Sequence, residues 1–366
     1  MFKIQSEVLK GVVGSIAKGA RKARLGENFI FIRTLEEGMV SIFFNGDNAS
    51  VERRVKADVQ GELDVATTLK EIDTKVAALP NDTEILVQLE GSLIKLKWGK
   101  KSAISVDTVP ETTPMIEIPE LVEQVTWAAG TVHGIARVMT PFTALPNSSI
   151  SQRNPSIVGP NFVKDPDTGE TFVRATDGFR AVTMRAAKID WFSESVSIEA
   201  SNLLSVADVL PKDAEISVGI NKGYSLVVFA SGSTTAVVRA LSGKYPQIDN
   251  LYRTDAKSKW RFDRLELIEL CRRVQILSPQ RPILEFRLIN GKVNAVIPNT
   301  LDQSIGVVID GIPSEFAINA KYLEMAASLF RTEEINLLVE AANKPITMRI
   351  DQSDDIRTVL SPAQLR

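Results

Sequence analysis

The chain has 366 residues, 44% of them hydrophobic and 24% charged, with a formal net charge of −2. This length corresponds to two or three domains, and the composition is ordinary for a globular protein. The near-neutral charge excludes a uniformly basic surface but leaves local basic patches open. No apolar run approaches the roughly 20 residues of a membrane-spanning helix, so we expect no membrane association.

Cysteine usage and the N-terminal sequence bear on the cellular compartment. The only cysteine, Cys271, excludes an intramolecular disulfide framework and fits a reducing environment. The first residues show neither a long apolar core nor a cleavage pattern, so no export signal is visible. We therefore predict a cytoplasmic protein.

The first segment of the chain opens with a possible edge strand at residues 1–4 and an amphipathic helix from about Ser6. The apolar stripe of this helix is Val8, Val12, Val13, Ile16 and Ala20. The opposite face carries cations at three- and four-residue spacings, and Arg24 lies just beyond them: Lys10, Lys18, Arg21 and Lys22. Several short strands follow, and a proline-rich linker near residues 110–119 ends the segment.

The second and third segments also combine helices and strands. Residues 120–140 read as a helix weakened by Gly130 and Gly134. A turn-rich stretch follows, and then a hairpin whose turn lies at residues 167–169. The third segment opens with a strand at 257–262 and a helix that Asp263 caps, with Glu266 three residues later.

A helix–turn–strand unit occurs three times, in residues 69–87, 202–218 and 321–339. Leu79, Leu210 and Leu329 are expected to end the three helices on a buried stripe, and each following strand opens on Glu-Ile. Spacings of this length indicate duplicated domains rather than a solenoid. We predict an α+β fold of three tandem copies, each with two helices packed on antiparallel sheets. The boundaries are residues 1–117, 118–249 and 250–366.

The sequence offers little catalytic chemistry. The only histidine, His133, has no cysteine or serine constellation around it, and one histidine with one cysteine cannot build a zinc site. There is no phosphate-binding P-loop and no dinucleotide fingerprint. Residues 165–169 resemble a calcium loop but lack its later acidic ligand, so we interpret them as a hairpin turn. We predict no enzyme, no cofactor and no metal site.

Several short motifs occur in order along the chain. Residues 175–180 read ATDGFR, residues 244–246 read KYP, and residues 273–278 read RVQILS. Together with the threefold repeat and the C-terminal residues 359–365, they resemble the bacterial DNA polymerase III beta subunit, the sliding clamp. The resemblance covers nearly the whole chain. It implies a head-to-tail homodimeric ring of DNA-clamp-type domains, with helices around duplex DNA.

The resemblance implies a DNA replication processivity factor that encircles double-stranded DNA without reading its sequence. Such a protein tethers a DNA polymerase and other proteins that carry clamp-binding motifs, and a separate clamp loader places it on DNA. The basic helical faces agree with this function, because cations can hold a phosphate backbone without contacting bases. The implied DNA contacts are Lys10, Lys18, Arg21, Lys22, Arg24, Arg137, Gln152, Arg153, Arg272 and Arg273.

Two further sites follow from the resemblance. An apolar cleft suits an extended peptide with aliphatic anchors. Its implied residues are Val158, Thr176, Gly178, Phe179, Arg180, Ala181, Pro246, Asn250, Leu251, Val359, Ser361, Pro362, Ala363 and Leu365. Phe179, Ala181, Asn250, Ser361 and Ala363 depart from the family's residues, which predicts a differently shaped cleft. The implied dimer interface joins Ile104 and Val106 of one copy to Ile276 and Leu277 of the next.

Two other functions stay open at this point. One is a clamp-like adaptor for DNA repair or regulation that keeps the ring but not the polymerase. The other is a monomeric three-domain scaffold that binds nucleic acid or protein. The cleft residues have an alternative interpretation too, because plain packing at a domain boundary produces a similar apolar pattern.

Overall fold

The computed structural model describes residues 1–23, 29–110, 117–187, 189–351 and 353–365. Residues 1–137 with 188–241 form one compact unit, and residues 138–187 with 242–366 form a second. The predicted domains 1–117 and 250–366 each lie within one unit, whereas 118–249 is divided between them. The three predicted boundaries therefore stay predictions. Within the described ranges, no helix combines the length and the apolar character needed to cross a membrane.

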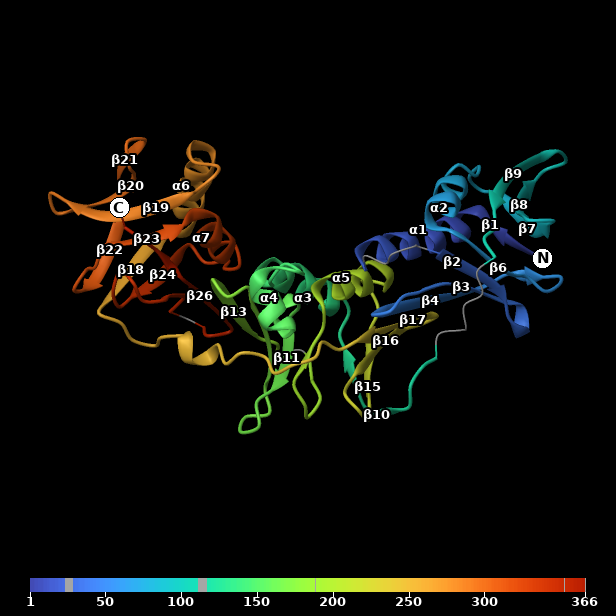
Figure 1. Ribbon diagram of the computed structural model, residues 1–366, viewed down its shortest axis with the longest axis horizontal. Helices are drawn as coiled ribbons and strands as arrows, with labels where there is room; N and C mark the ends of the chain where they lie inside the picture. The colour runs from blue at the N-terminus through green and yellow to red at the C-terminus, as the bar shows by residue number, and fades with distance from the viewer. Residues whose placement is uncertain (24–28, 111–116, 188, 352, 366) are drawn as a thin grey trace. The chain divides into compact units, whose positions relative to one another are not determined.

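The order of elements repeats three times along the chain, as expected. Each copy begins with a strand and a helix, continues through several strands to a second helix, and ends with three strands (Figure 1). The first copy consists of β1 (Phe2–Gln5), α1 (Ser6–Lys22), β2 (Phe29–Thr34), β3 (Met39–Asn45), β4 (Ala49–Lys56), β5 (Asp58–Val59), β6 (Asp64–Thr68), α2 (Leu69–Ala77), β7 (Glu84–Glu90), β8 (Leu93–Trp98) and β9 (Ser102–Asp107).

The second copy carries additional short helices between its first helix and its strands. Its elements are β10 (Leu121–Trp127), α3 (Thr131–Met139), η2 (Thr140–Phe142), α4 (Ser149–Arg153), η3 (Pro155–Val158), β11 (Asn161–Lys164), β12 (Thr171–Thr176), β13 (Arg180–Arg185), β14 (Val196–Ser197), α5 (Ala200–Val209), β15 (Ile216–Asn221), β16 (Leu226–Ser231) and β17 (Thr234–Arg239). The short helix η4 (Asp249–Leu251) lies in the segment that leads to the third copy.

The third copy returns to the simpler pattern and adds one short strand at its end. Its elements are β18 (Ser258–Asp263), α6 (Arg264–Leu277), β19 (Ile283–Ile289), β20 (Lys292–Ile297), β21 (Leu301–Ile305), β22 (Val307–Gly311), β23 (Phe316–Asn319), α7 (Ala320–Ala327), β24 (Glu334–Val339), β25 (Ile346–Arg349), β26 (Ile356–Leu360) and β27 (Pro362–Ala363).

Each unit is built on antiparallel sheets with helices packed against them. The first unit has the strand orders β5-β1-β7-β8-β9 and β10-β15-β16-β17-β4-β3-β2-β6. The second has β11-β12-β13-β26-β25-β24-β18-β22 and β21-β20-β19-β23-β27. Trp260, Phe262, Phe286 and Phe316 form an aromatic cluster in the core of the second unit. The α+β fold class predicted from the sequence is confirmed.

Helix α1 packs against both α2 and α5 in the first unit (Figure 1). Its buried stripe contains Val12, Val13, Ile16 and Ala20 as predicted, but Val8 is 42% exposed and Leu9 is buried in its place. The reason is angular, because Leu9 lies on the same helical face as Val13 and Ile16, whereas Val8 is turned about 100° away from it. The prediction for Val8 was wrong.

The second helices end slightly earlier than predicted. α2, α5 and α7 end at Ala77, Val209 and Ala327 rather than at the three leucines. Leu79 and Leu210 are still buried, but in the third copy Phe330 is buried and Leu329 is only half-buried. In the third copy Phe330 therefore takes the core position that Leu79 and Leu210 occupy in the other two.

The start of the second copy corrects another prediction. Residues 120–140 are not one helix, because β10 occupies the first part and α3 begins only at Thr131. Exposure alternates along β10 up to the buried Trp127, which is the pattern of a strand with one buried face. Gly130 has φ +76°, a backbone conformation that ends the strand and that glycine adopts without strain.

Candidate nucleic-acid interface and peptide cleft

The cations of α1 lie on its solvent face, but most of them have polar partners. Lys18 Nζ lies 2.7 Å from Asp208 Oδ1 of α5, and Arg21 pairs with Asp73 of α2. Lys10 Nζ donates to Asn81 Oδ1 at 2.7 Å. Lys22 is exposed and has no ion pair with any residue that the structure describes. Arg24, which the sequence also assigns to this face, lies outside the described residues.

Two cations of the second copy are exposed on short helices. Arg137 is on the last turn of α3 and Arg153 is on the last turn of α4. Neither forms an ion pair within the described ranges. Gln152, next to Arg153, donates through Nε2 to the backbone oxygen of Asn147 at 3.3 Å. Cations near helix C-termini are favourably placed against the helix dipole, so their positions also stabilise the helices.

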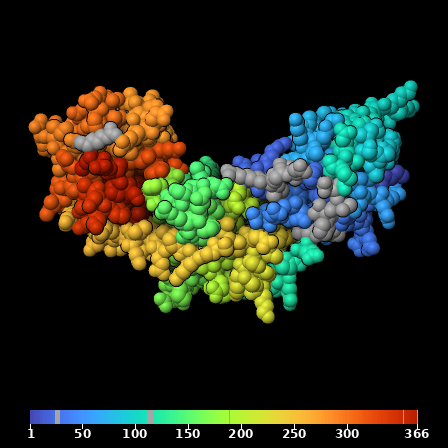
Figure 2. Space-filling view, in the orientation of Figure 1, coloured from blue at the N-terminus to red at the C-terminus, as the bar shows by residue number. Residues whose placement is uncertain are grey.

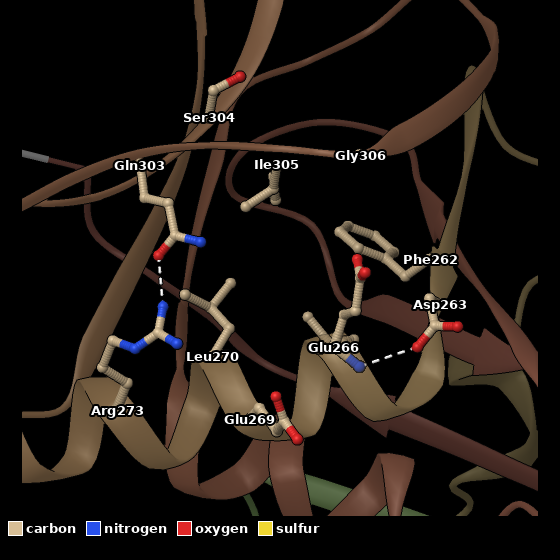
Figure 3. A pocket seen from close by; sticks show the side chains of 11 residues that line it. Phe262, Asp263, Glu266, Glu269, Leu270, Arg273, Gln303, Ser304, Ile305 and Gly306 are labelled. Carbon is tan, nitrogen blue, oxygen red and sulfur yellow. Dashed lines mark hydrogen bonds between the residues drawn. The ribbon is translucent and has the colours of Figure 1, made fainter.

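Helix α6 directs its two adjacent arginines to different neighbours. Arg272 Nε donates to Glu324 Oε1 of α7 at 2.7 Å. Arg273 Nη1 donates to Gln303 Oε1 of β21 at 2.5 Å, across a cavity of about 410 Å³ between α6 and the β21–β22 turn (Figure 3). Successive helical residues point about 100° apart, which separates the two guanidinium groups. The prediction of one shared basic face therefore needs correction for Arg273.

The cavity beside α6 is mostly polar. Its wall combines acidic side chains of α6 with backbone and small side chains at the end of β21 (Figure 3). Asp263 Oδ1 accepts a hydrogen bond from the Glu266 backbone N–H at 2.8 Å, which confirms the predicted helix cap. Among the titratable groups that the structure describes, no cluster of three or more histidine, cysteine or carboxylate side chains could hold a metal ion.

The ATDGFR motif forms a tight turn between β12 and β13. Asp177 Oδ1 accepts hydrogen bonds from the backbone N–H groups of Phe179 at 2.9 Å and Arg180 at 3.0 Å. Thr176 Oγ1 accepts from Gly178 N at 3.1 Å and donates to Arg180 O at 2.8 Å. Gly178 has φ +87°, which explains the glycine. The turn leaves the Phe179 side chain 51% exposed.

Arg180 is largely buried by contacts with its neighbours. Its side chain is only 9% exposed, and its Nε lies 2.9 Å from Asp177 Oδ2. Nη2 donates to the Pro141 backbone oxygen at 2.7 Å, and the guanidinium carbon lies 4.4 Å from the centre of the Tyr322 ring of α7. These contacts hold Arg180 against the turn and give it a positioning role. A guanidinium group has five N–H donors, so the peptide contact of Arg180 stays a prediction.

The predicted cleft has a buried floor. Val158, Thr176, Ala181 and Val359 are each less than 10% exposed. Ala181 is paired with Val359 across β13 and β26, on the face opposite to Arg180, because neighbouring residues of a strand point to opposite sides. These four side chains are therefore buried, and their place in a peptide cleft stays a prediction.

The cover over this floor comes from the segment between the second and third copies. Tyr245 and Ile248 pack with Ala181, Ala144 and Ile157 in a small apolar cluster. Tyr252 packs at its edge and accepts a hydrogen bond from Thr183 Oγ1 at 3.0 Å. Burial raises the pKa of both tyrosine hydroxyls, so they stay protonated at neutral pH. Figure 2 shows this segment, in gold, at the molecular surface.

The exposed members of the predicted cleft are here called its rim. Gly178, Phe179, Asn250 and Leu251 are exposed, and Leu251 keeps 41% of its surface accessible. The Ser361 backbone N–H donates to the Phe179 backbone oxygen at 2.8 Å and ties the C-terminal segment to the turn. The remaining predicted members are half-buried: Pro246, Ser361, Pro362, Ala363 and Leu365.

The residues predicted at a subunit interface lie next to open sheet edges. β9 is the last strand of one sheet in the first unit, and β21 is the last strand of one sheet in the second. Ile276 is 79% exposed and Leu277 is 43% exposed. Ile104 is half-buried, but Val106 is fully buried against Ile94 of β8, so its side chain cannot reach a partner. The prediction for the Val106 side chain was wrong.

The histidine and the cysteine show no catalytic arrangement. Burial, followed by the charge of Lys212, lowers the pKa of His133, which keeps the ring neutral at pH 7. Burial raises the pKa of the Cys271 thiol, so it remains a thiol and a poor nucleophile. Among the residues that the structure describes, neither side chain lies against a partner for acid–base or nucleophilic chemistry.

Comparisons with known proteins place this geometry among sliding clamps. No protein-family model matches the sequence. The chain is 20% identical over 331 residues to a beta sliding clamp from Synechococcus elongatus, which covers 86% of this chain and 85% of the relative. Its structure is similar to the DNA polymerase III beta subunit of Thermotoga maritima, with a TM-score of 0.86, 17% identity and coverage of 100% and 99% of the two chains.

A second solved structure gives the same result. The griselimycin-bound sliding clamp (DNA polymerase III subunit beta) from Bartonella birtlesii matches with a TM-score of 0.88 and 14% identity, over 100% of this chain and 99% of that chain. At sequence identities this low, the structural similarity establishes the fold alone. The chain has the fold of DNA polymerase III beta sliding clamps over its whole length.

Sequence reasoning missed two groups of residues that the structure brings to these sites. The cleft floor is covered by Tyr245, Ile248 and Tyr252. The available signal was their three- and four-residue spacing, which starts at the tyrosine of the KYP motif. The carboxylates that pair with the helix cations were missed too. They lie on second helices far away in sequence, and no local pattern connects them to the cations.

Proposed function

We propose that this chain, which has the fold of the DNA polymerase III beta sliding clamps, is a non-catalytic replication processivity factor that encircles duplex DNA. The similarity of fold over the whole chain is the observation that carries the proposal. Exposed cations on α1, α3 and α4 supply sequence-independent contacts to the phosphate backbone. Tethering of a DNA polymerase and loading by a clamp loader belong to the same proposal.

The ring proposed here forms by pairing two chains head to tail. The open edge of β9 would add to the open edge of β21 of the second chain, and Ile276 and Leu277 would be buried beside them. Unpaired strand edges with apolar neighbours favour this kind of association. Arg273 lies three and four residues before these two side chains on the same helical face, so we assign it to the interface rather than to DNA.

Sedimentation equilibrium tests the ring. The wild type is expected to be a dimer at micromolar concentration, and Ile276→Asp with Leu277→Asp is expected to be a monomer. Leu265→Asp is the matched control, because Leu265 is 58% exposed on the first turn of the same helix. A wild type that remains monomeric at micromolar concentration contradicts the ring and favours a monomeric scaffold.

Fluorescence anisotropy with a labelled duplex of arbitrary sequence tests the DNA contacts. Lys22→Glu with Arg137→Glu should weaken binding of the duplex. Each phosphate contact releases about 0.9 counterions on binding, and this favourable release is lost with the contact. Lys56→Glu with Lys257→Glu changes the net charge equally at exposed positions outside the helices. Equal effects of the two pairs would refute the assignment of the helical cations.

The peptide site that we propose is the rim around Phe179 and Leu251, above the buried floor. The Bartonella birtlesii neighbour was solved bound to griselimycin, so this compound is a convenient probe. Calorimetry should show binding to the wild type, and Phe179→Ala with Leu251→Ser should weaken it at least about tenfold. Val308→Ala, at another exposed apolar position, should leave it unchanged. Equal binding by both variants would exclude the rim.

A further inference from the structure

Three of the cations assigned to the DNA-facing helices are paired with a carboxylate from a second helix. Lys18 of α1 lies 2.7 Å from Asp208 of α5, and Arg21 of α1 contacts Asp73 of α2. In the second unit, Arg272 of α6 lies 2.7 Å from Glu324 of α7. Every pair therefore crosses from a first helix to a second helix.

These three pairs share one order of exposure. Asp208, Asp73 and Glu324 keep only 20%, 26% and 20% of their side-chain surface, whereas their cations keep 61%, 56% and 63%. The order differs among ion pairs outside the helices. It is reversed in Arg33–Asp64, with 23% and 59%, and in Arg349–Asp354, with 22% and 55%, whereas Arg54–Glu52, with 43% and 7%, has the same order as the helical pairs. The helical carboxylates thus lie beneath the cations, on the protein side of the surface.

A carboxylate in this position acts on any phosphate that approaches the cation. The phosphate and the carboxylate contact the same cation, so they lie within the Debye length of about 8 Å of each other. Salt therefore screens the repulsion between these two anions only partly. The carboxylate also holds the cation in place, which favours binding. Exposed ion pairs contribute little rigidity, so we expect the repulsion to be the larger effect.

We propose that Asp73, Asp208 and Glu324 are charge-damping residues that keep the grip of the helical cations on duplex DNA loose. The inference rests on the proposed function, because it concerns the same DNA-facing surface. A ring that moves along DNA needs contacts that form and break quickly, and partial neutralisation of the cations supplies that property. Lys22, Arg137 and Arg153, which have no such carboxylate among the described residues, would provide the undamped contacts.

The test compares two triple variants with equal changes of net charge. One is Asp73→Asn, Asp208→Asn and Glu324→Gln, which keeps the size of each side chain and one of its two acceptor oxygens while removing the charge. The control is Asp64→Asn, Asp310→Asn and Asp354→Asn, whose carboxylates are exposed outside the helices and pair with Arg33, Arg261 and Arg349. Circular dichroism confirms folding, and the corresponding single variants replace either triple variant if it fails to fold. Affinity for a labelled duplex is then measured from low to physiological salt.

We expect the helical triple variant to bind duplex about tenfold more tightly than the control, from three weak pairs of ordinary strength. The slope of log affinity against log salt should also become steeper by up to about 2.7, or 0.9 per restored phosphate contact. Equal or weaker binding than the control overturns the inference while leaving the proposed function intact. If the wild type and both variants fail to bind duplex even at low salt, the proposed function and the inference are both overturned.

Discussion

Gly19 lies where α1 closely approaches α5, and its replacement by alanine provides a sharp test of this packing. A Cβ atom at this position would lie 2.5 Å from Val209 Cγ2, 3.1 Å from Ser205 Oγ and 3.3 Å from the Ser205 backbone oxygen. Val209 is β-branched and buried, so it has little freedom to turn away. Overpacking of this kind costs about 1 to 3 kcal/mol.

The same helix contains its own control. Gly14 has no neighbouring atom within 4 Å of a new Cβ. Alanine is favoured over glycine in a helix interior by about 1 kcal/mol, and this gain applies at both positions. We therefore expect Gly14→Ala to stabilise the protein and Gly19→Ala to be less stable than Gly14→Ala by about 1 to 3 kcal/mol.

Urea unfolding followed by circular dichroism measures both effects. Because the chain forms two compact units, the comparison uses the transition that changes between variants rather than one global free energy. Val209→Ala should be tolerated better in the Gly19→Ala background than alone, with a coupling of at least about 0.5 kcal/mol. Equal stabilisation by the two glycine substitutions would refute the close approach of α1 to α5.

Two further predictions concern single side chains. Because burial lowers the pKa of His133 in the folded state, the unfolded chain binds more protons, so stability should fall as the pH drops below the ordinary value of 6.5. His133→Gln should weaken the pH dependence of the urea midpoint between about pH 7.5 and 5.5. Since His133 is the only histidine, an unchanged pH dependence in this variant would exclude the explanation. Arg180→Met should destabilise the second unit by about 2 to 4 kcal/mol, because it leaves Asp177 without its ion-pair partner and removes the contact with Tyr322. Arg180→Lys should not restore stability, since an ammonium group cannot reproduce the planar guanidinium contacts, and wild-type stability of either variant would contradict the positioning role.

Much of the fold could be predicted because helices and strands leave periodic patterns of apolar residues in the sequence. The stripe of Val12, Val13 and Ile16 in α1 follows directly from helical periodicity. The strand β10 had only a partial signal, since polar and apolar residues alternate from Gln124 to Trp127 but not in the residues before them. The opposite directions of Arg180 and Ala181 were available from the period of two along a strand.

The candidate sites depended on contacts that no local pattern records. Neither the cover of Tyr245 and Ile248 over Ala181 nor the different neighbours of Arg272 and Arg273 could be predicted. In each case the deciding partner is far away in sequence. A periodic pattern shows which side of an element is apolar, but it does not show which other element covers that side.

The sequence by itself determined that the chain repeats an α+β domain three times and carries cations on the polar faces of its first helices. Both properties follow from short-range periodicity and composition, which act through backbone geometry and the burial of apolar side chains. The tertiary structure alone decided which cations remain free. Lys18 and Lys22 look alike in the sequence, and only the packing of α5 against α1 places Asp208 beneath one of them.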